Sequence, residues 1–135
     1  PDPTDRMAFV PPADRPVLRL RRDAHLFSSR PELAERLARD RRALPLAPDE
    51  LLHAATPAGY LVRRGRLRVT ELLPDGREIT RAVLQAGAGL ETASGGATDP
   101  RDDTYLLADV ILTALGEAEL WQVPAGSFDP ARERP

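Results

Sequence analysis

The sequence predicts a mainly β protein with a flanking helix, in which short antiparallel strands close into a small roll or barrel. Three observations predict it. Residues 59–85 contain three successive strand-like runs. Turn signals divide the second half of the chain about every eight to twelve residues. A single helical pattern, residues 30–42, precedes these strands.

The organising stretch is residues 59–85, GYLVRRGRLRVTELLPDGREITRAVLQ. Leu67 and Val69 alternate with polar residues, so one face can be buried while the other stays wet. Ile79 and Val83 recur at even spacing in the next run. The Asp-Gly pair between the runs tolerates the positive φ of a hairpin turn. With Gly65 as an earlier turn, we expect a β-meander.

The helix is predicted from its boundary residues and its apolar stripe. Ser29 can cap the N-terminus, and Glu32 stands three residues later to complete a capping box. Pro31 falls in the first turn, where its missing N–H costs nothing. Leu33 and Leu37 lie on one face, which predicts a side that packs against the strands.

The other segments divide the chain into an arm, a domain and a tail. Residues 1–16 hold five prolines, which predicts an extended N-terminal arm. The domain spans residues 17–128, and residues 129–135 form a C-terminal tail. Residues 17–22 are consistent with either a short strand or the start of a helix. The polar, glycine-rich loop at 91–104 is either functional or disordered.

Composition excludes several classes of function. The 135 residues carry 19 basic and 21 acidic side chains, a net charge of −2 that gives no general field for attracting nucleic acid. Without cysteine there is no disulfide, thiolate zinc site or cysteine-ligated iron–sulfur cluster. No apolar run approaches the ~20 residues that span a bilayer. We therefore expect a cytoplasmic protein without membrane contact.

From residue 25 to residue 128 the chain resembles the cyclic-nucleotide-binding-like β-roll, or jelly roll, of the CRP/FNR transcription regulators. Residues 25–52 resemble the family's entry helix and first strands, and residues 60–91 its central hairpins and glycine corner. LTALGEAELWQVPAGSF resembles its closing strands. The resemblance implies a bacterial sensor domain that binds a small-molecule effector and forms a homodimer in the full-length regulator.

The same resemblance suggests effector-binding residues. Members that bind cyclic AMP hold its ribose with a corner Glu and its phosphate with an Arg-Ser/Thr-Ala step. Gly89 and Glu91 match the corner, with Thr92 beside them. The arginine step falls on LLA at 106–108, where only the alanine matches. Cyclic-nucleotide binding is therefore doubtful unless Arg101 swings in from the loop, and we expect no cofactor.

The family's other half lies outside this sequence. After Phe128 only DPARERP follows, so DNA would be bound only through a missing C-terminal helix-turn-helix. The alternative function is a non-sensing protein-interaction or structural module, whose pocket is filled by Leu106 and Leu107. No nucleophile motif or phosphate loop is present, so we do not expect an enzyme.

Three further features have ordinary structural interpretations. His25 and His53 lie in different elements without nearby ligands, so no metal site is predicted. The arginines at 64, 66 and 68 are expected to share one solvated strand face and to pair in part with Glu71 or Glu78. Trp121 is expected to pack in the core or against a missing helix.

Overall fold

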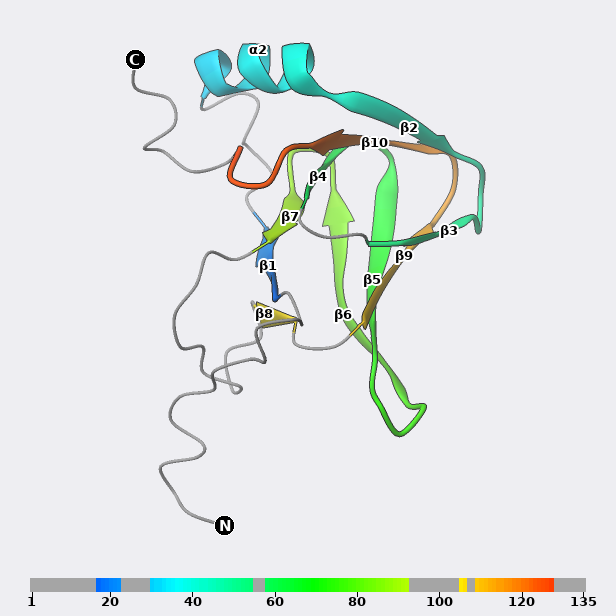
Figure 1. The fold of residues 1–135 in the computed structure, drawn as a ribbon. Coiled ribbons are helices and arrows are strands. Elements are labelled where there is room, and N and C mark those ends of the chain that lie inside the picture. Colours follow the sequence, from blue (N-terminus) through cyan, green and yellow to red (C-terminus); the bar gives the residue numbers. More distant parts are fainter. Residues whose placement is uncertain (1–16, 23–29, 55–57, 93–104, 107–108, 128–135) are drawn as a thin grey trace, which may run out of the picture.

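In a computed structural model, the described residues are 17–22, 30–54, 58–92, 105–106 and 109–127. They form one helix and two antiparallel sheets that pack face to face (Figure 1). The predicted class, mainly β with a flanking helix, is confirmed. The predicted arm, the tail and most of the 91–104 loop lie outside the described residues, as do His25 and Arg101.

The larger sheet has six strands among the described residues. Their order across the sheet is β2 (Arg42–Leu46), β10 (Ala118–Val123), β4 (Gly59–Arg64), β7 (Gly89–Thr92), β1 (Leu18–Arg21) and β8 (Tyr105–Leu106). The segment at 17–22, for which two interpretations were open, is therefore a strand. It lies between β7 and β8 and pairs with both in antiparallel register.

The smaller sheet has four strands, in the order β3 (Leu51–His53), β9 (Asp109–Ala114), β5 (Arg66–Leu72) and β6 (Glu78–Gln85). The two sheets enclose one aliphatic core. Its most deeply buried members are Val62, Leu67, Val69, Leu90, Leu106, Leu112 and Ala114. The predicted alternation in β5 is confirmed, because Leu67 and Val69 are fully buried while Arg66 and Arg68 are exposed.

The predicted β-meander is wrong at its first turn. β4 and β5 do not pair with one another, because β4 lies in the six-stranded sheet and β5 in the four-stranded sheet. Gly65 is the corner at which the chain crosses between them. Its φ is +82°, and a Cβ there would lie 2.5 Å from the Glu117 carbonyl oxygen. The corner therefore needs glycine for both backbone conformation and space.

The second turn is the predicted hairpin. β5 and β6 pair in antiparallel register around the turn at 73–77, where Gly76 has a φ of +90°. The backbone N–H of Arg77 donates to Asp75 Oδ1 at 3.0 Å. Ile79 and Val83 remain 40% and 47% exposed, and Leu84 is the buried residue of β6. Val83 lies opposite exposed Arg68, so it belongs to the outer face.

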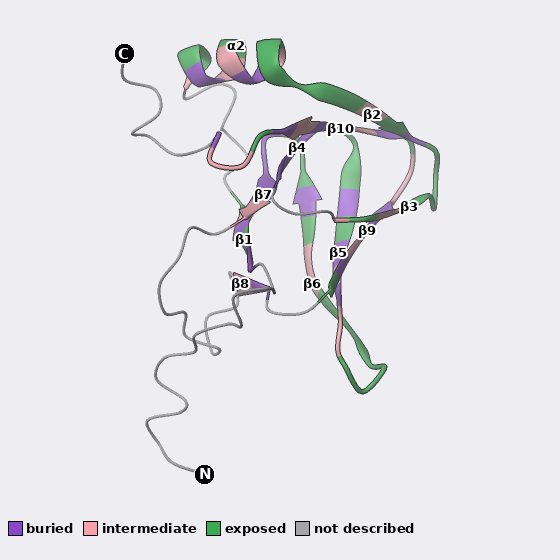
Figure 2. Cartoon of the chain, viewed as in Figure 1, coloured by how far each residue is buried: buried purple, intermediate pink, exposed green. Residues whose placement is uncertain are grey.

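The helix α2 (Pro31–Asp40) lies against the outer side of the six-stranded sheet beside β10 (Figure 1). Pro31 is in the first turn as predicted, but the predicted capping box is wrong. Arg30 is the N-cap, and no side chain caps the helix. Leu33 and Leu37 are the buried residues of the helix. The buried parts of α2 lie on its side toward the sheet (Figure 2).

These two leucines form a second apolar cluster with Leu61, Trp121 and Val123. Trp121 therefore packs in the core, one of the two expected positions. At the end of the fold, Arg36 Nη2 donates to the Ser127 carbonyl oxygen at 2.6 Å. No helix in the described part of the chain is long and apolar enough to cross a bilayer.

Candidate functional site

The corner that the resemblance singled out begins at Gly89, the first residue of β7. A Cβ at Gly89 would lie 2.1 Å from the Tyr60 carbonyl oxygen. Gly89 thus permits β7 to lie directly on β4, with Leu90 opposite Tyr60. Its role in the structure is close strand packing, and this packing sets the start of the corner.

Glu91 is the candidate carboxylate of the corner, and another strand supplies a cation to it. Its Oε1 lies 3.3 Å from Arg21 Nη1, and the two side chains are 12% and 26% exposed. Arg21 comes from β1, which pairs with β7. The alternating apolar and basic residues of LRLR at 18–21 predict a two-faced strand, but not which strand it would join.

Thr92 hydrogen-bonds the end of β7 to the residue that precedes β4. Its Oγ1 accepts the Ala58 N–H at 3.0 Å and donates to the Ala58 carbonyl oxygen at 3.2 Å. The Thr92 N–H donates to the same carbonyl oxygen at 3.0 Å. The hydroxyl is therefore already engaged by the backbone of the neighbouring strand.

Leu106 occupies the position where the resemblance places the phosphate-binding arginine. It is fully buried in the main core and lies opposite Leu18 of β1. A leucine in that position contributes apolar packing and no hydrogen-bond donor from its side chain. The other two residues of the step, at 107–108, lie outside the described residues, as does Arg101.

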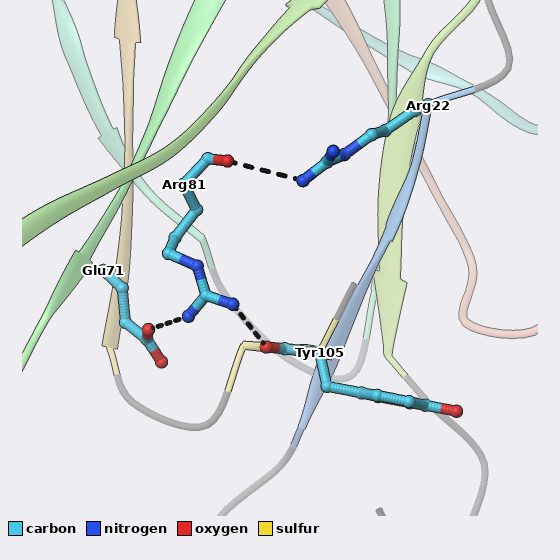
Figure 3. A network of polar contacts seen from close by, with 4 residues as sticks. All are labelled: Arg22, Glu71, Arg81 and Tyr105. Atoms are coloured by element: carbon cyan, nitrogen blue, oxygen red, sulfur yellow. Dashed lines mark hydrogen bonds and ion pairs between the residues drawn. The ribbon is translucent and has the colours of Figure 1, made fainter. Parts of the chain in front are cut away.

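A charged cluster lies near this end of the roll, between β5, β6, β8 and the end of β1 (Figure 3). Glu71 of β5 is only 3% exposed and accepts a hydrogen bond from Arg81 Nη1 at 2.5 Å. Arg81 Nη2 donates to the Tyr105 carbonyl oxygen at 3.4 Å. Arg22 Nη2 donates to the Arg81 carbonyl oxygen, also at 3.4 Å.

A β-bulge aims the Arg81 side chain at Glu71. The register changes from Val69 opposite Ala82 to Thr70 opposite Thr80, so Arg81 is the extra residue without a cross-strand partner. A bulge of this kind redirects a side chain. It lets a residue of β6 reach the β8 backbone, and the guanidinium thereby connects the two sheets.

Sequence reasoning missed this cluster. It paired Glu71 with the arginines at 64, 66 and 68, but Glu71 is buried and binds Arg81. Arg64 does not share the strand of Arg66 and Arg68, because it lies on β4 and forms an ion pair with Glu119 at 2.8 Å. A bulge leaves no signal in a pattern of alternating residues, so the position of Arg81 was not predictable.

A cleft of about 580 Å³ lies elsewhere on the roll, lined by Pro45, Leu46, Ala47, Glu50, Arg64, Glu117, Ala118 and Glu119. The Trp121 indole N–H donates to Glu119 Oε2 at 2.9 Å, and Arg64 donates to Glu119 Oε1. The indole hydrogen bond and then the Arg64 hydrogen bond lower the pKa of Glu119 below its usual value of 4.5. Glu119 therefore stays ionised to lower pH than an isolated glutamate.

The described residues gather no group of three or more His, Asp or Glu side chains that could hold a metal ion. His53 is exposed, and its Nε2 lies 4.0 Å from Asp109 Oδ1 at the outer edge of the small sheet.

Comparison with solved structures identifies the fold. The crystal structure of oxidized CprK in complex with o-chlorophenolacetic acid matches 74% of this chain and 40% of its own, with a TM-score of 0.53 and 10% sequence identity. This chain has the β-roll fold of the CRP/FNR sensor domains. The recognition made from the sequence is thereby confirmed at the level of the fold.

Two other solved structures are similar to this chain over most of its length. The N-terminal domain of a transcriptional regulator from Streptomyces coelicolor A3(2) is 22% identical with a TM-score of 0.49, and covers 81% of this chain and 76% of its own. The Thermus thermophilus catabolite activator protein is 18% identical, also with a TM-score of 0.49. The match covers 76% of this chain and 47% of the Thermus chain. The chain thus spans less than half of the CprK and Thermus chains. No protein-family model and no curated protein matches the sequence.

Proposed function

We propose that this chain is the sensor domain of a CRP/FNR-like transcription regulator, with an effector corner that has lost the features needed for a cyclic nucleotide. The domain does no chemistry of its own. An effector held at the corner would shift the segment that follows Ser127 and so reorient a DNA-binding domain in a longer protein, which would act as a homodimer.

Two observations support the proposal that the pocket is degenerate. The carboxylate of the corner, Glu91, pairs with Arg21 of the same chain, and Leu106 fills the core where a phosphate-binding arginine would be needed. A bidentate arginine contact to phosphate is charge-assisted and contributes a few kcal/mol. The Leu106 side chain has no hydrogen-bond donor that could replace that contact. Arg81, the nearby guanidinium, is engaged by Glu71.

Isothermal titration with cyclic AMP and cyclic GMP tests this proposal. We expect no binding tighter than about 10 μM for either nucleotide. Arg21→Ala is the informative variant, because it removes the ion pair between Arg21 and Glu91 without supplying a phosphate ligand, and we expect it to leave nucleotide binding undetected. Binding of either nucleotide tighter than that limit by the wild type would overturn the degenerate pocket.

A second candidate function is a protein-interaction or structural module built on the same roll. The observation that favours it is the filled interior, in which Leu18, Leu90 and Leu106 are each at most 4% exposed. A thermal-shift screen of small organic anions separates the two functions. A ligand that raises the melting temperature, and whose effect Glu91→Gln abolishes, supports the sensor, and no such ligand supports the module.

A further inference from the structure

The outer face of the four-stranded sheet carries side chains in regular rows across the strands. This face is separate from the corner at Gly89 and Glu91, which belongs to the other sheet. Cross-strand pairing places Val83, Arg68, Thr113 and Leu51 in one row across all four strands. The parallel row contains Thr80, Thr70, Ile111 and His53. Leu51 is 62% exposed and Val83 47% exposed. Leu51 and Val83 are thus exposed apolar side chains at the two edges of this face, whereas Thr113 between them is only 6% exposed.

The two ends of this face carry opposite charges. At one end Arg66 and Arg68 are both exposed. At the other end Glu78, Leu72 and Asp109 form a third row, because Leu72 lies opposite both Glu78 and Asp109. From Arg66 to Leu72 the strand advances about 20 Å, so basic and acidic ends are well separated.

Among the described residues, the charged side chains at the two ends have few ionic partners. Within the part of the chain that the structure describes, no ion pair uses Arg66, Arg68 or Glu78, and the contact of Asp109 with His53 is 4.0 Å long. These side chains differ in this respect from the exposed arginines at 64 and 77, which have carboxylate partners at 2.8 and 2.7 Å.

We infer that this face binds the same face of a second copy of the chain, with the two sheets stacked and their strands antiparallel. A two-fold axis in the plane of the interface, perpendicular to the strands, places β5 over β5 and reverses its direction. Arg66 of one copy then lies over Leu72 of the other, between Glu78 and Asp109. The same contact recurs at the other end, so the face is complementary to itself.

The small size of the face favours a weak association. Four strands about 4.8 Å apart and about 20 Å long give a footprint of roughly 300 Å², well below the roughly 800 Å² per partner of a standard interface. The dimer is therefore weak, with a dissociation constant on the order of 100 μM. This inference does not depend on the proposed effector corner.

Sedimentation equilibrium of the whole chain, up to about 1 mM protein, measures the association. Arg66→Glu/Arg68→Glu and Glu78→Arg/Asp109→Arg each place like charges against each other. We expect each double variant alone to raise the dissociation constant at least about tenfold. An equimolar mixture of the two restores opposite charges at both ends of the interface. We expect it to form a heterodimer close to the strength of the wild type.

Arg39→Glu is the matched control, because Arg39 is an exposed arginine on α2, on the other sheet. It should leave the dissociation constant unchanged within about twofold. A wild type that stays monomeric at every concentration overturns the inference. So does association that neither double variant weakens, or a mixture of the two variants that stays monomeric.

Discussion

Glu71 and Arg81 form the most strongly buried ion pair in the described residues, and their side chains are 5% and 19% exposed. Removing one partner leaves a buried charge without compensation, whereas replacing both with apolar groups is often neutral. We expect Arg81→Ala to lower the free energy of unfolding by about 2–4 kcal/mol, discounted for the partial exposure of Arg81.

The double variant Glu71→Leu/Arg81→Met should recover most of that loss, and urea unfolding of all four members of this cycle measures it. The control is Arg77→Ala. Arg77 pairs with Asp75 at 2.7 Å, but both side chains are more than half exposed, so the expected loss is at most about 0.5 kcal/mol. Equal losses for Arg81→Ala and Arg77→Ala would contradict the buried pair.

The lowered pKa of Glu119 predicts that the free energy of unfolding depends on pH in the acid range. Its pKa is lowered in the folded state, so the folded state binds a proton more weakly than the unfolded state. The contribution is complete above the usual value of 4.5 and is lost as pH falls through the lowered pKa. Glu119→Gln removes this dependence and costs at most about 1 kcal/mol at neutral pH.

Urea unfolding of wild type and Glu119→Gln at a series of pH values checks this prediction. The difference in unfolding free energy between them should shrink as the solution is acidified. A difference that stays constant, or grows, with falling pH would mean that the indole and guanidinium hydrogen bonds do not favour the ionised carboxylate.

At the scale of elements, the corner at Gly65 carries the chain from the six-stranded sheet into the four-stranded sheet. Alanine there meets the Glu117 carbonyl oxygen at 2.5 Å and requires a φ of +82°. Gly76 is the matched control, since its φ is +90° but nothing lies within 4 Å of an added Cβ.

We expect Gly65→Ala to cost about 3 kcal/mol and Gly76→Ala about 1 kcal/mol, because only the first adds a clash to backbone strain. Urea midpoints at constant m-value give both numbers. Costs that are equal within error would show that β4 can move away from β10 at little expense.

Some strand pairings could be predicted from the sequence and others could not. The hairpin of β5 and β6 was predictable, because Asp-Gly chemistry and residue alternation are both local signals. The separation of β4 from β5 was not, since β4 pairs instead with β10 and β7, and β10 lies more than 50 residues further along the chain. Partner choice among strands is set by such distant contacts, which alternation alone cannot encode.

The same reasoning applies to the candidate site. The corner at Gly89 and Glu91 was found through the family resemblance, and the structure gives Gly89 a packing reason. Arg21 and Arg81 were missed. One sits on a strand whose partners were unpredictable, and the other is positioned by a bulge. Candidate carboxylates can thus be read from sequence more readily than the cations that neutralise them.

For the whole molecule, the central claim is that the first described strand, β1, covers the corner at Gly89 and Glu91. β1 buries Leu18 and Leu20 in the core, lies between β7 and β8, and brings Arg21 to Glu91. The pairing with β7 and β8 and the ion pair to Glu91 all depend on where β1 lies.

Nuclear Overhauser spectroscopy of the backbone tests that placement most directly. The account predicts antiparallel cross-strand contacts between β1 and β7, with Leu18 opposite Thr92 and Leu20 opposite Leu90. The same spectrum should show Leu18 against Leu106 of β8. A spectrum in which residues 18–21 give no contact to β7 would contradict it, because Glu91 would then face the corner without Arg21.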